Sequence, residues 1–473
     1  MKFKNGIVLC ILAGAVPCTA LATNGLSLDA YGPISAGLGG AGMAFDNGMS
    51  AAMNNPATLG LMREGNHVEG GVIYLGPSVK ATAATLEAES LATTFLMPQL
   101  GYGRKSGPLT YGLAIFPSGG MGAEYAADSF AAAGSGELVR SEMAVLRAVV
   151  PVAYNITSDL TVGATLDYAR GGMDVKLAMT GAQFGDMVAA LGGTQRAGTA
   201  SGTLVSALAS NMGTAIEGVN WVRFDFSDNS ALTQAASGSG MGGKLGAVYK
   251  VMPELTLGAT YHLKTKLGSL MAKDATLSMN MTGPMCGGAG VSCSVPITGE
   301  LAVKDFAWPD MVGFGFAYQP MDGLTLVGDY KLIRWADVMS AFNIGFTPAT
   351  TQANATANAI VTGGGTALDA QLFQRWNNQN VFALGAMYQL TPAVTLRGGL
   401  NLANNPIPDE YVNPIFPAIL KNAYHVGAGY AWDASSDFNL AFDYAPGVEA
   451  TNGSSVKSKL GGIGSQFTYA YHF

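Results

Sequence analysis

The sequence has few charged residues and no long apolar run. Charged side chains make up 12% of the 473 residues, about half the share of an average soluble domain. The formal net charge is −7 and no block of Lys and Arg occurs, which argues against a nucleic-acid-binding protein. No stretch in the body of the chain reaches the roughly 18 uninterrupted apolar residues of a transmembrane helix. Because hydrophobic residues still make up 49%, a soluble β-rich protein or a membrane protein built from strands remains.

Cysteine and histidine are also scarce. Cys10 and Cys18 lie in the first 22 residues, and only Cys286 and Cys293 follow, on either side of a Gly-rich stretch. In an exported chain we expect these two to form a disulfide that closes the loop. A metal site is the alternative, but the histidines lie far away in sequence, at His67, His262, His425 and His472. The sequence therefore predicts no metal and no cofactor.

The first 22 residues are typical of a secretory signal peptide. Lys2 and Lys4 supply a positive start, residues 6–16 form a short apolar run, and Ala20-Leu21-Ala22 places small residues at the cleavage positions. An anchoring helix is the alternative, and the residues before Cys18 are a poor match to a lipoprotein signal. We expect cleavage after Ala22 and export of the chain.

The rest of the chain has the alternating pattern of β-strands. In segment 436–446, Phe438, Leu440, Phe442 and Tyr444 share one face, and small or polar residues occupy the other. This period of two indicates strands with one apolar face. Tyr and Trp often stand near the strand ends, as expected where strands cross both interfaces of a bilayer. A soluble sandwich, whose apolar faces would meet in a core, is the alternative.

About fourteen such segments are joined alternately by short turns and long connections, which predicts an up-and-down outer-membrane barrel. They fall near residues 64–76, 93–105, 109–121, 141–156, 160–179, 239–251, 255–270, 299–319, 324–346, 378–390, 394–404, 421–433, 436–446 and 464–473. The last segment ends in alternating aromatics up to Phe473, which resembles the recognition signal for barrel assembly. We therefore expect an all-β transmembrane antiparallel barrel of about 14 strands over residues 63–473, in the bacterial outer membrane.

Residues 23–62 do not fit a plain barrel. They are rich in Gly and Ala and have no clean period. Gly37-Leu38-Gly39-Gly40-Ala41-Gly42 formally matches a dinucleotide-binding motif, but that reading requires a preceding strand and a following helix. We instead expect a compact segment with tight turns that folds into the barrel lumen as a plug.

Residues 181–220 form a second exception, with helical spacing in what should be a long outer loop. Two short amphipathic helices are predicted there. Their apolar faces either pack on each other and on the rim, or form a groove that collects a hydrophobic ligand. The candidate residues of that groove are Phe184, Met187, Val188, Leu191, Val205, Leu208 and Met212.

A proline interrupts the third predicted strand. Residues 109–116 have a strand pattern, after which Pro117 removes a ladder donor and Gly119-Gly120 weakens the pairing. Inside a closed barrel this is tolerable only where the backbone bends inward, away from lipid. We expect Pro117 in a strand displaced from the wall beside the N-terminal segment; a loop that starts at Phe116 is the alternative.

The chain resembles the FadL/TodX family of outer-membrane transporters for long-chain fatty acids and other hydrophobic compounds. The resemblance covers nearly all of the chain after residue 22, in order. It rests on Gly39-Gly40-Ala41-Gly42-Met43-Ala44-Phe45-Asp46, Asn55-Pro56-Ala57, Val72-Ile73-Tyr74-Leu75-Gly76-Pro77, Ala259-Thr260-Tyr261, Trp308-Pro309-Asp310-Met311, Asp329-Tyr330-Lys331-Leu332-Ile333-Arg334-Trp335 and Asn405-Pro406-Ile407-Pro408.

The resemblance implies a fourteen-stranded barrel with an N-terminal hatch, and passive diffusion of ligand with lateral exit into the membrane. By resemblance, the outer groove is residues 181–220 with help from the Cys286–Cys293 loop, and the hatch contact is Asn55-Pro56-Ala57. The kink is Phe116-Pro117-Ser118-Gly119-Gly120. No catalytic residue is implied, so we do not expect an enzyme.

A ligand carboxylate would favour a basic partner in the lumen. Candidates are Arg170, Lys264, Lys266, Lys331, Arg334 and Arg397. The tenth strand opens Asn377-Asn378-Gln379-Asn380, without the lysine expected of fatty-acid transporters, which leaves uncharged hydrocarbons open. The expected surroundings are outer-membrane lipid and lipopolysaccharide, and we expect a monomer. A general diffusion porin and an outer-membrane lipid-modifying enzyme are the alternative functions.

Overall fold

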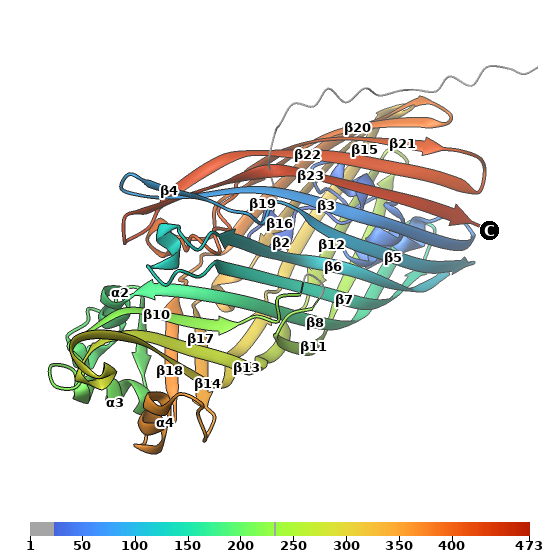
Figure 1. The fold of residues 1–473 in the computed structure, drawn as a ribbon. Helices are drawn as coiled ribbons and strands as arrows, with labels where there is room; N and C mark the ends of the chain where they lie inside the picture. The colour runs from blue at the N-terminus through green and yellow to red at the C-terminus, as the bar shows by residue number, and fades with distance from the viewer. Residues whose placement is uncertain (1–22, 231–232) are drawn as a thin grey trace, which may run out of the picture.

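The computed structural model describes residues 23–230 and 233–473. The predicted signal peptide, residues 1–22, lies outside the described residues. Long antiparallel strands form one sheet that closes on itself into a barrel, as expected from the alternating pattern (Figure 1).

The ring of the barrel closes because the last strand pairs with the first long strand. Successive members of the ring are hydrogen-bonded antiparallel neighbours. In ring order they are β3 (Gly65–Ala83), β5 (Phe95–Ser106), β6 (Leu109–Tyr125), β7 (Val139–Asn155), β8 (Leu160–Thr180), β11 (Ala236–Met252), β12 (Leu255–His262), β15 (Met311–Met321), β16 (Leu324–Ile333), β19 (Gln379–Thr391), β20 (Val394–Ala403), β21 (Asn422–Ala431), β22 (Ser436–Thr451) and β23 (Val456–His472).

A long hairpin corrects the expected strand count. Strands β13 (Thr265–Gly283) and β14 (Gly288–Trp308) rise between β12 and β15 and continue them outward. Counted with this hairpin, the barrel has 16 strands rather than the expected 14. The predicted segments 255–270 and 299–319 each joined parts of two strands, β12 with β13 and β14 with β15, because the alternation continues across each junction.

Smaller elements gather at one end of the barrel, opposite the end where the chain finishes (Figure 1). They surround the tip of the β13–β14 hairpin and connect the outer ends of the wall strands. These elements are β4 (Leu86–Glu89), α2 (Gly181–Met187), β9 (Gly198–Ser201), α3 (Thr203–Asn211), β10 (Gly218–Phe226), β17 (Ala341–Pro348), α4 (Ala355–Thr362) and β18 (Leu368–Phe373). The short turns lie at the other end, so the two rims differ as the sequence predicts.

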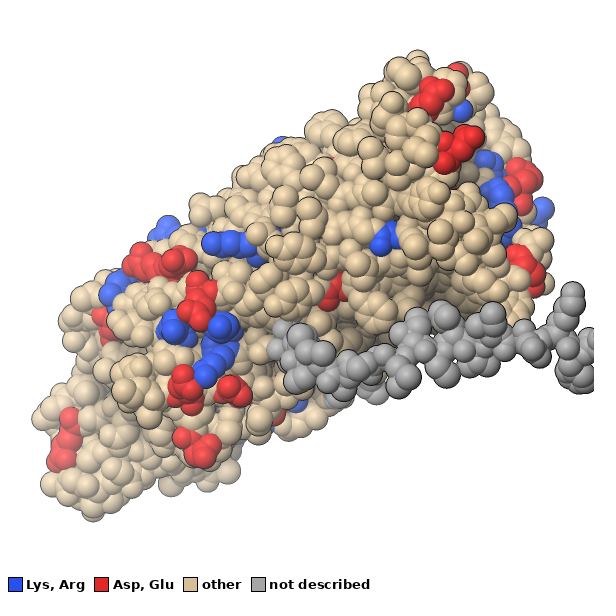
Figure 2. Space-filling view, turned by 90° about the horizontal axis from the view of Figure 1, so that it is seen from above, with Lys and Arg blue, Asp and Glu red and all other residues tan. Residues whose placement is uncertain are grey.

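The outer face of the wall is apolar. On β8, Leu166 and Tyr168 are 58% and 47% exposed, whereas Asp167 between them is fully buried toward the lumen. Lys, Arg, Asp and Glu gather toward the two ends of the molecule, and a largely uncharged band lies between them (Figure 2). Among the described residues, no helix is both long enough and apolar enough to cross a bilayer.

The N-terminal segment, residues 23–62, lies inside the ring (Figure 1). It contains β1 (Thr23–Asn24), β2 (Ser27–Leu28), α1 (Pro33–Ala36) and two 3₁₀ turns, η1 (Gly48–Ala52) and η2 (Pro56–Leu61). Its apolar side chains pack against β6 and β7 through Phe116 and Val149, and against β15, β16 and β19 on another side. A Cβ added to Gly246 of β11 would overlap the Asn55 side chain, so the wall carries glycine where the segment approaches most closely.

Candidate functional site

Strand β6 leaves its neighbour β5 part-way along. The β5–β6 ladder runs from Ser106↔Leu109 to Leu100↔Ile115 and stops there. Beyond this point β6 still pairs with β7, but the register shifts by one residue between Pro117 and Gly119. Ser118 is therefore the extra residue of a β-bulge, which bends a strand locally. The wall consequently lacks β5–β6 ladder pairs beyond Ile115.

The N-terminal segment occupies the place that β5 has left. Ser27 of β2 pairs with Gly119, whose φ of +148° is unfavourable for other residues. The Tyr31 hydroxyl donates a hydrogen bond to the Ser118 carbonyl oxygen at 2.8 Å. Phe116 is buried in a cluster with Met49 of η1 and with Met53 and Met62 of the same segment. The bulge and the N-terminal segment thus contact each other through backbone and side chains.

A cluster of charged side chains holds the other side of the bulge. Arg147 of β7 donates from Nε to Ser118 Oγ at 2.8 Å, and its guanidinium lies 3.3 Å from Asp167 of β8. Lys244 of β11 contacts the same carboxylate at 2.5 Å, and Thr265 accepts a bond from Arg147 at 3.1 Å. All four side chains are buried. Buried charges of this kind are stable only when paired, so the cluster fixes Ser118 relative to three wall strands.

Sequence reasoning missed this cluster. Each of Arg147, Asp167 and Lys244 stands on the lumen-facing side of its strand, and a buried charge requires a partner. That signal identifies single candidates. It does not show that β7, β8 and β11 are adjacent, because residues 181–235 separate the last two in sequence.

The cluster borders a central cavity of about 60 Å³. Its walls include Tyr31 and Ser27 from the N-terminal segment and Trp308 from β14. His262 also lines it and contacts the Asn54 carbonyl oxygen through Nε2 at 2.9 Å. The cavity therefore lies between the N-terminal segment and the wall, next to the bulge.

A larger cavity opens among the outer loops. Its volume is about 440 Å³, and it is lined by α2, by the end of β18 and by the connections near residues 410–415 and 452–456. Apolar side chains such as Phe130, Met187 and Ile415 form its interior, and Arg196 and Glu410 are among its polar lining residues. This arrangement suits an apolar ligand that arrives from a polar surface.

Two small apolar cavities lie beneath it, of about 10 and 30 Å³. Leu177 and Leu372 line both of them and the outer cavity as well. The larger of the two also has Phe224, Phe342 and Phe416 in its wall. Trp335 is in edge contact with Trp308, which lines the central cavity, and with Trp376.

Only some of the predicted groove residues line a cavity in the structure. Met187 lines the outer cavity, and Phe184 lines the small cavity below it. The remaining predicted residues line none of the cavities described here: Val188, Leu191, Val205, Leu208 and Met212. They pack into the core of the outer loops instead, because α3 lies against β9, β18 and α4.

The predicted basic contacts also separate. Of the six predicted basic residues, only Lys331 lines the central cavity. Its side-chain nitrogen donates to the Gly40 carbonyl oxygen at 2.6 Å. Arg170 is exposed on the same face of β8 as Leu166 and Tyr168, so it points away from the lumen. Arg334 bonds Asp310 at 2.9 Å, and Arg397 is half-buried beside Gly37. Lys264 and Lys266 are exposed.

Asn55 fastens the N-terminal segment to the wall. Its side-chain nitrogen donates to the carbonyl oxygens of Met43 and Ala247, at 2.7 and 3.2 Å. Its oxygen accepts from the backbone of Ala57, and Pro56 begins the η2 turn. Asn55-Pro56-Ala57 therefore combines a turn cap with a contact to β11.

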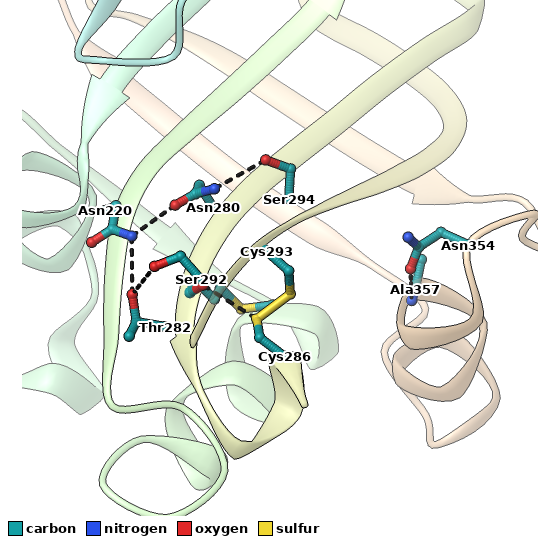
Figure 3. Close-up of a disulfide and its surroundings, with 10 residues drawn as sticks. Asn220, Asn280, Thr282, Cys286, Ser292, Cys293, Ser294, Asn354 and Ala357 are labelled. Carbon is teal, nitrogen blue, oxygen red and sulfur yellow. Dashed lines mark hydrogen bonds between the residues drawn. A yellow bond between two sulfur atoms is a disulfide. The ribbon is translucent and has the colours of Figure 1, made fainter. Parts of the chain in front are cut away.

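The two cysteines form a disulfide at the tip of the β13–β14 hairpin (Figure 3). Beside it, Asn220 of β10 donates to Asn280 and Thr282 of β13, and Asn280 donates to Ser294 of β14. The disulfide residues line none of the cavities described above. The bond thus belongs to the frame of the outer loops.

Comparison with known proteins identifies the family. Residues 11–471 match the model of the outer membrane protein transport protein family (OMPP1/FadL/TodX). The chain belongs to this family. The crystal structure of the toluene transporter TodX from P. putida is similar, with a TM-score of 0.79 and 28% identity over 94% of this chain and 99% of that one. The toluene transporter TbuX from Ralstonia pickettii gives a TM-score of 0.72, with 28% identity and the same coverage.

An uncharacterized protein of Chlorobium limicola is 44% identical over 90 residues, which are 19% of this chain and 43% of that protein. The chain thus spans less than half of this relative. The family and the structurally similar proteins are outer-membrane transport channels for hydrophobic compounds, not enzymes. This agrees with the expectation of a transporter and removes the lipid-modifying enzyme from consideration.

Proposed function

We propose that this chain carries small apolar molecules across the outer membrane by passive diffusion and releases them sideways through the bulge in β6. The outer cavity collects the ligand, the apolar cavities beneath it receive the ligand next, and the central cavity delivers it to the bulge. Transfer of each methylene from water to such sites contributes about 0.8 kcal/mol. Exit into lipid then avoids return of the ligand to water.

The missing β5–β6 pairing supports the lateral exit most directly. In a closed barrel, unpaired backbone facing lipid costs several kcal/mol for each group. Here β6 turns inward instead, and Ser27, Tyr31 and Arg147 satisfy groups at the bulge. Movement of β1 and β2 away from Gly119 uncovers the interval between β5 and β6. Residues 23–62 act as the plug, with Asn55 as the fixed contact to β11.

The cavities favour a small uncharged ligand over a long fatty acid. The lining of the inner apolar cavities consists almost wholly of hydrophobic side chains, several of them aromatic. The buried cations near the bulge already have partners in Asp167 and the Gly40 carbonyl oxygen. We therefore propose aromatic hydrocarbons such as toluene as cargo, carried by a monomer surrounded by lipopolysaccharide.

The test combines uptake with conductance. Cells that lack other hydrocarbon channels and produce this chain should take up labelled toluene faster than cells with an empty vector. The purified protein in planar bilayers should show no steady ionic current, because residues 23–62 fill the lumen. A large steady current would indicate a porin instead, and uptake equal to the vector control would reject the transport proposal.

A further inference from the structure

Two histidines meet where the barrel closes. His67 lies near the start of β3 and His472 is the last residue of β23, and they face each other in the register of these two strands. Their Nδ1 atoms are 2.6 Å apart, and the rings meet edge to face at an angle of 79°. This contact therefore joins the first and last long strands at the short-turn end of the barrel.

The other ring nitrogens determine which atoms carry hydrogen. His67 Nε2 lies 2.8 Å from the Arg63 carbonyl oxygen, which can only accept. His472 Nε2 lies 2.7 Å from a carboxylate oxygen of Asp437 on β22. Both Nε2 atoms therefore donate, and in two neutral rings both Nδ1 atoms would be lone pairs.

Two lone pairs at this distance repel each other, so a positive charge must lie between them. A zinc ion bound at about 2.0–2.1 Å to each nitrogen would hold them roughly 3.3 Å apart, farther than observed. Within the described residues, no group of three or more His, Cys, Asp or Glu side chains is arranged to hold a metal ion. A shared proton fits the short distance.

We propose that His67 and His472 share one proton and form a cationic clasp that holds the two ends of the barrel wall together. His472 donates to the Asp437 carboxylate, which balances the charge of the clasp. Asp437 also accepts a hydrogen bond from Asn439 at 2.7 Å. The clasp lies at the end of the β3–β23 pairing, which keeps one register from Val456↔Ala83 to His472↔His67.

Charged groups of both signs surround the pair. The acidic groups on the elements packed against the histidine pair are Asp46 in the N-terminal segment, Glu69 on β3, Asp437 on β22 and the carboxylate of Phe473, whose oxygen accepts from Asn66. The basic groups are Arg63, which precedes β3, and Arg397 on β20, which interacts with Asp437.

A second proton would break the clasp. It would place two full positive charges on rings whose nitrogens are 2.6 Å apart, with no hydrogen bond between them. The clasp is therefore held by one shared proton and is lost when both rings are charged. The first and last strands should then separate more readily at their short-turn ends.

Nitrogen-15 NMR of the full chain in detergent micelles tests the shared proton. The chain has only four histidines, so His262→Gln and His425→Gln variants assign the spectrum. We expect scalar coupling between the Nδ1 atoms of His67 and His472, and its loss in His472→Gln. Absence of coupling in the wild type, or a signal that disappears with a chelator and returns with zinc, would overturn the proposal.

Thermal unfolding on gels supplies the stability readout. On acidification, the unfolding temperature of the wild type should fall several degrees more than that of His472→Gln or His67→Gln, because only the wild type has a pair of rings to charge twice. An equal decrease in all three proteins would contradict the clasp, and it would leave the transport proposal unaffected.

Discussion

Deletion of Ser118 should close the lateral exit. On the two sides of the bulge, Pro117 pairs with Leu146 and Gly119 pairs with Val145. Ser118 is the one extra residue between them, so its removal brings both sides into one continuous β6–β7 register. A regular β6 would then follow the wall and face β5 beyond Ile115.

The free energy gained by closure can be worked from the ladder. β5 residues 95–99 pair with β3 and lack a partner on the β6 side. Pro98 and Pro117 each lack a donor, so about three new backbone bonds at roughly 1 kcal/mol each favour the closed wall by about 3 kcal/mol. The open population should fall by about 100-fold, since every 1.4 kcal/mol is tenfold. Because Ser118 is absent from the variant, its contacts to Tyr31 and Arg147 no longer favour the bulged arrangement over the closed wall.

The assay is the initial rate of labelled toluene uptake by cells that produce each variant. Deletion of Gly447 is the matched control, because it removes a one-residue bulge between β22 and β23, where Ala445 pairs with Gly462 and Val448 with Leu460. Heat-modified mobility on gels should show that both variants fold. We expect uptake near the vector background for the Ser118 deletion and near wild type for the Gly447 deletion. A folded Ser118 deletion with wild-type uptake would refute lateral exit through the bulge.

Three further outcomes follow from the same geometry. Tyr31→Phe removes the hydrogen bond to Ser118, which contributes about 1 kcal/mol. Toluene uptake should therefore rise by up to about fivefold. A decrease in uptake would mean that the contact helps transport. Leu177→Trp fills the point shared by three cavities and should lower uptake by about tenfold or more, whereas Leu177→Met should retain it. Cys286→Ser combined with Cys293→Ser should destabilise the hairpin tip by about 2 kcal/mol, measured by hydrogen exchange there, with uptake and barrel melting unchanged.

The sequence by itself was enough to identify the barrel strands and the side chains that face the lipid. Alternation of apolar and small residues is a local property of each strand, so segments such as 436–446 identified the barrel and its lipid-facing side chains without tertiary information. Pro117 and the glycines after it predicted a local break in the third strand, because proline removes a ladder donor and glycine weakens the pairing. The short spacing of Cys286 and Cys293 in an exported chain predicted their disulfide.

Only the tertiary structure decided which groups meet across strands. The ring brings Arg147, Asp167 and Lys244 together and places Tyr31 against Ser118, although the members of each set are far apart in sequence. The structure also shows Arg170 on the outer face of β8 and the β13–β14 hairpin as part of the wall. Most of the predicted groove residues pack between elements of the outer loops. Register and closure depend on the whole sheet, and a single segment carries no information about its partner.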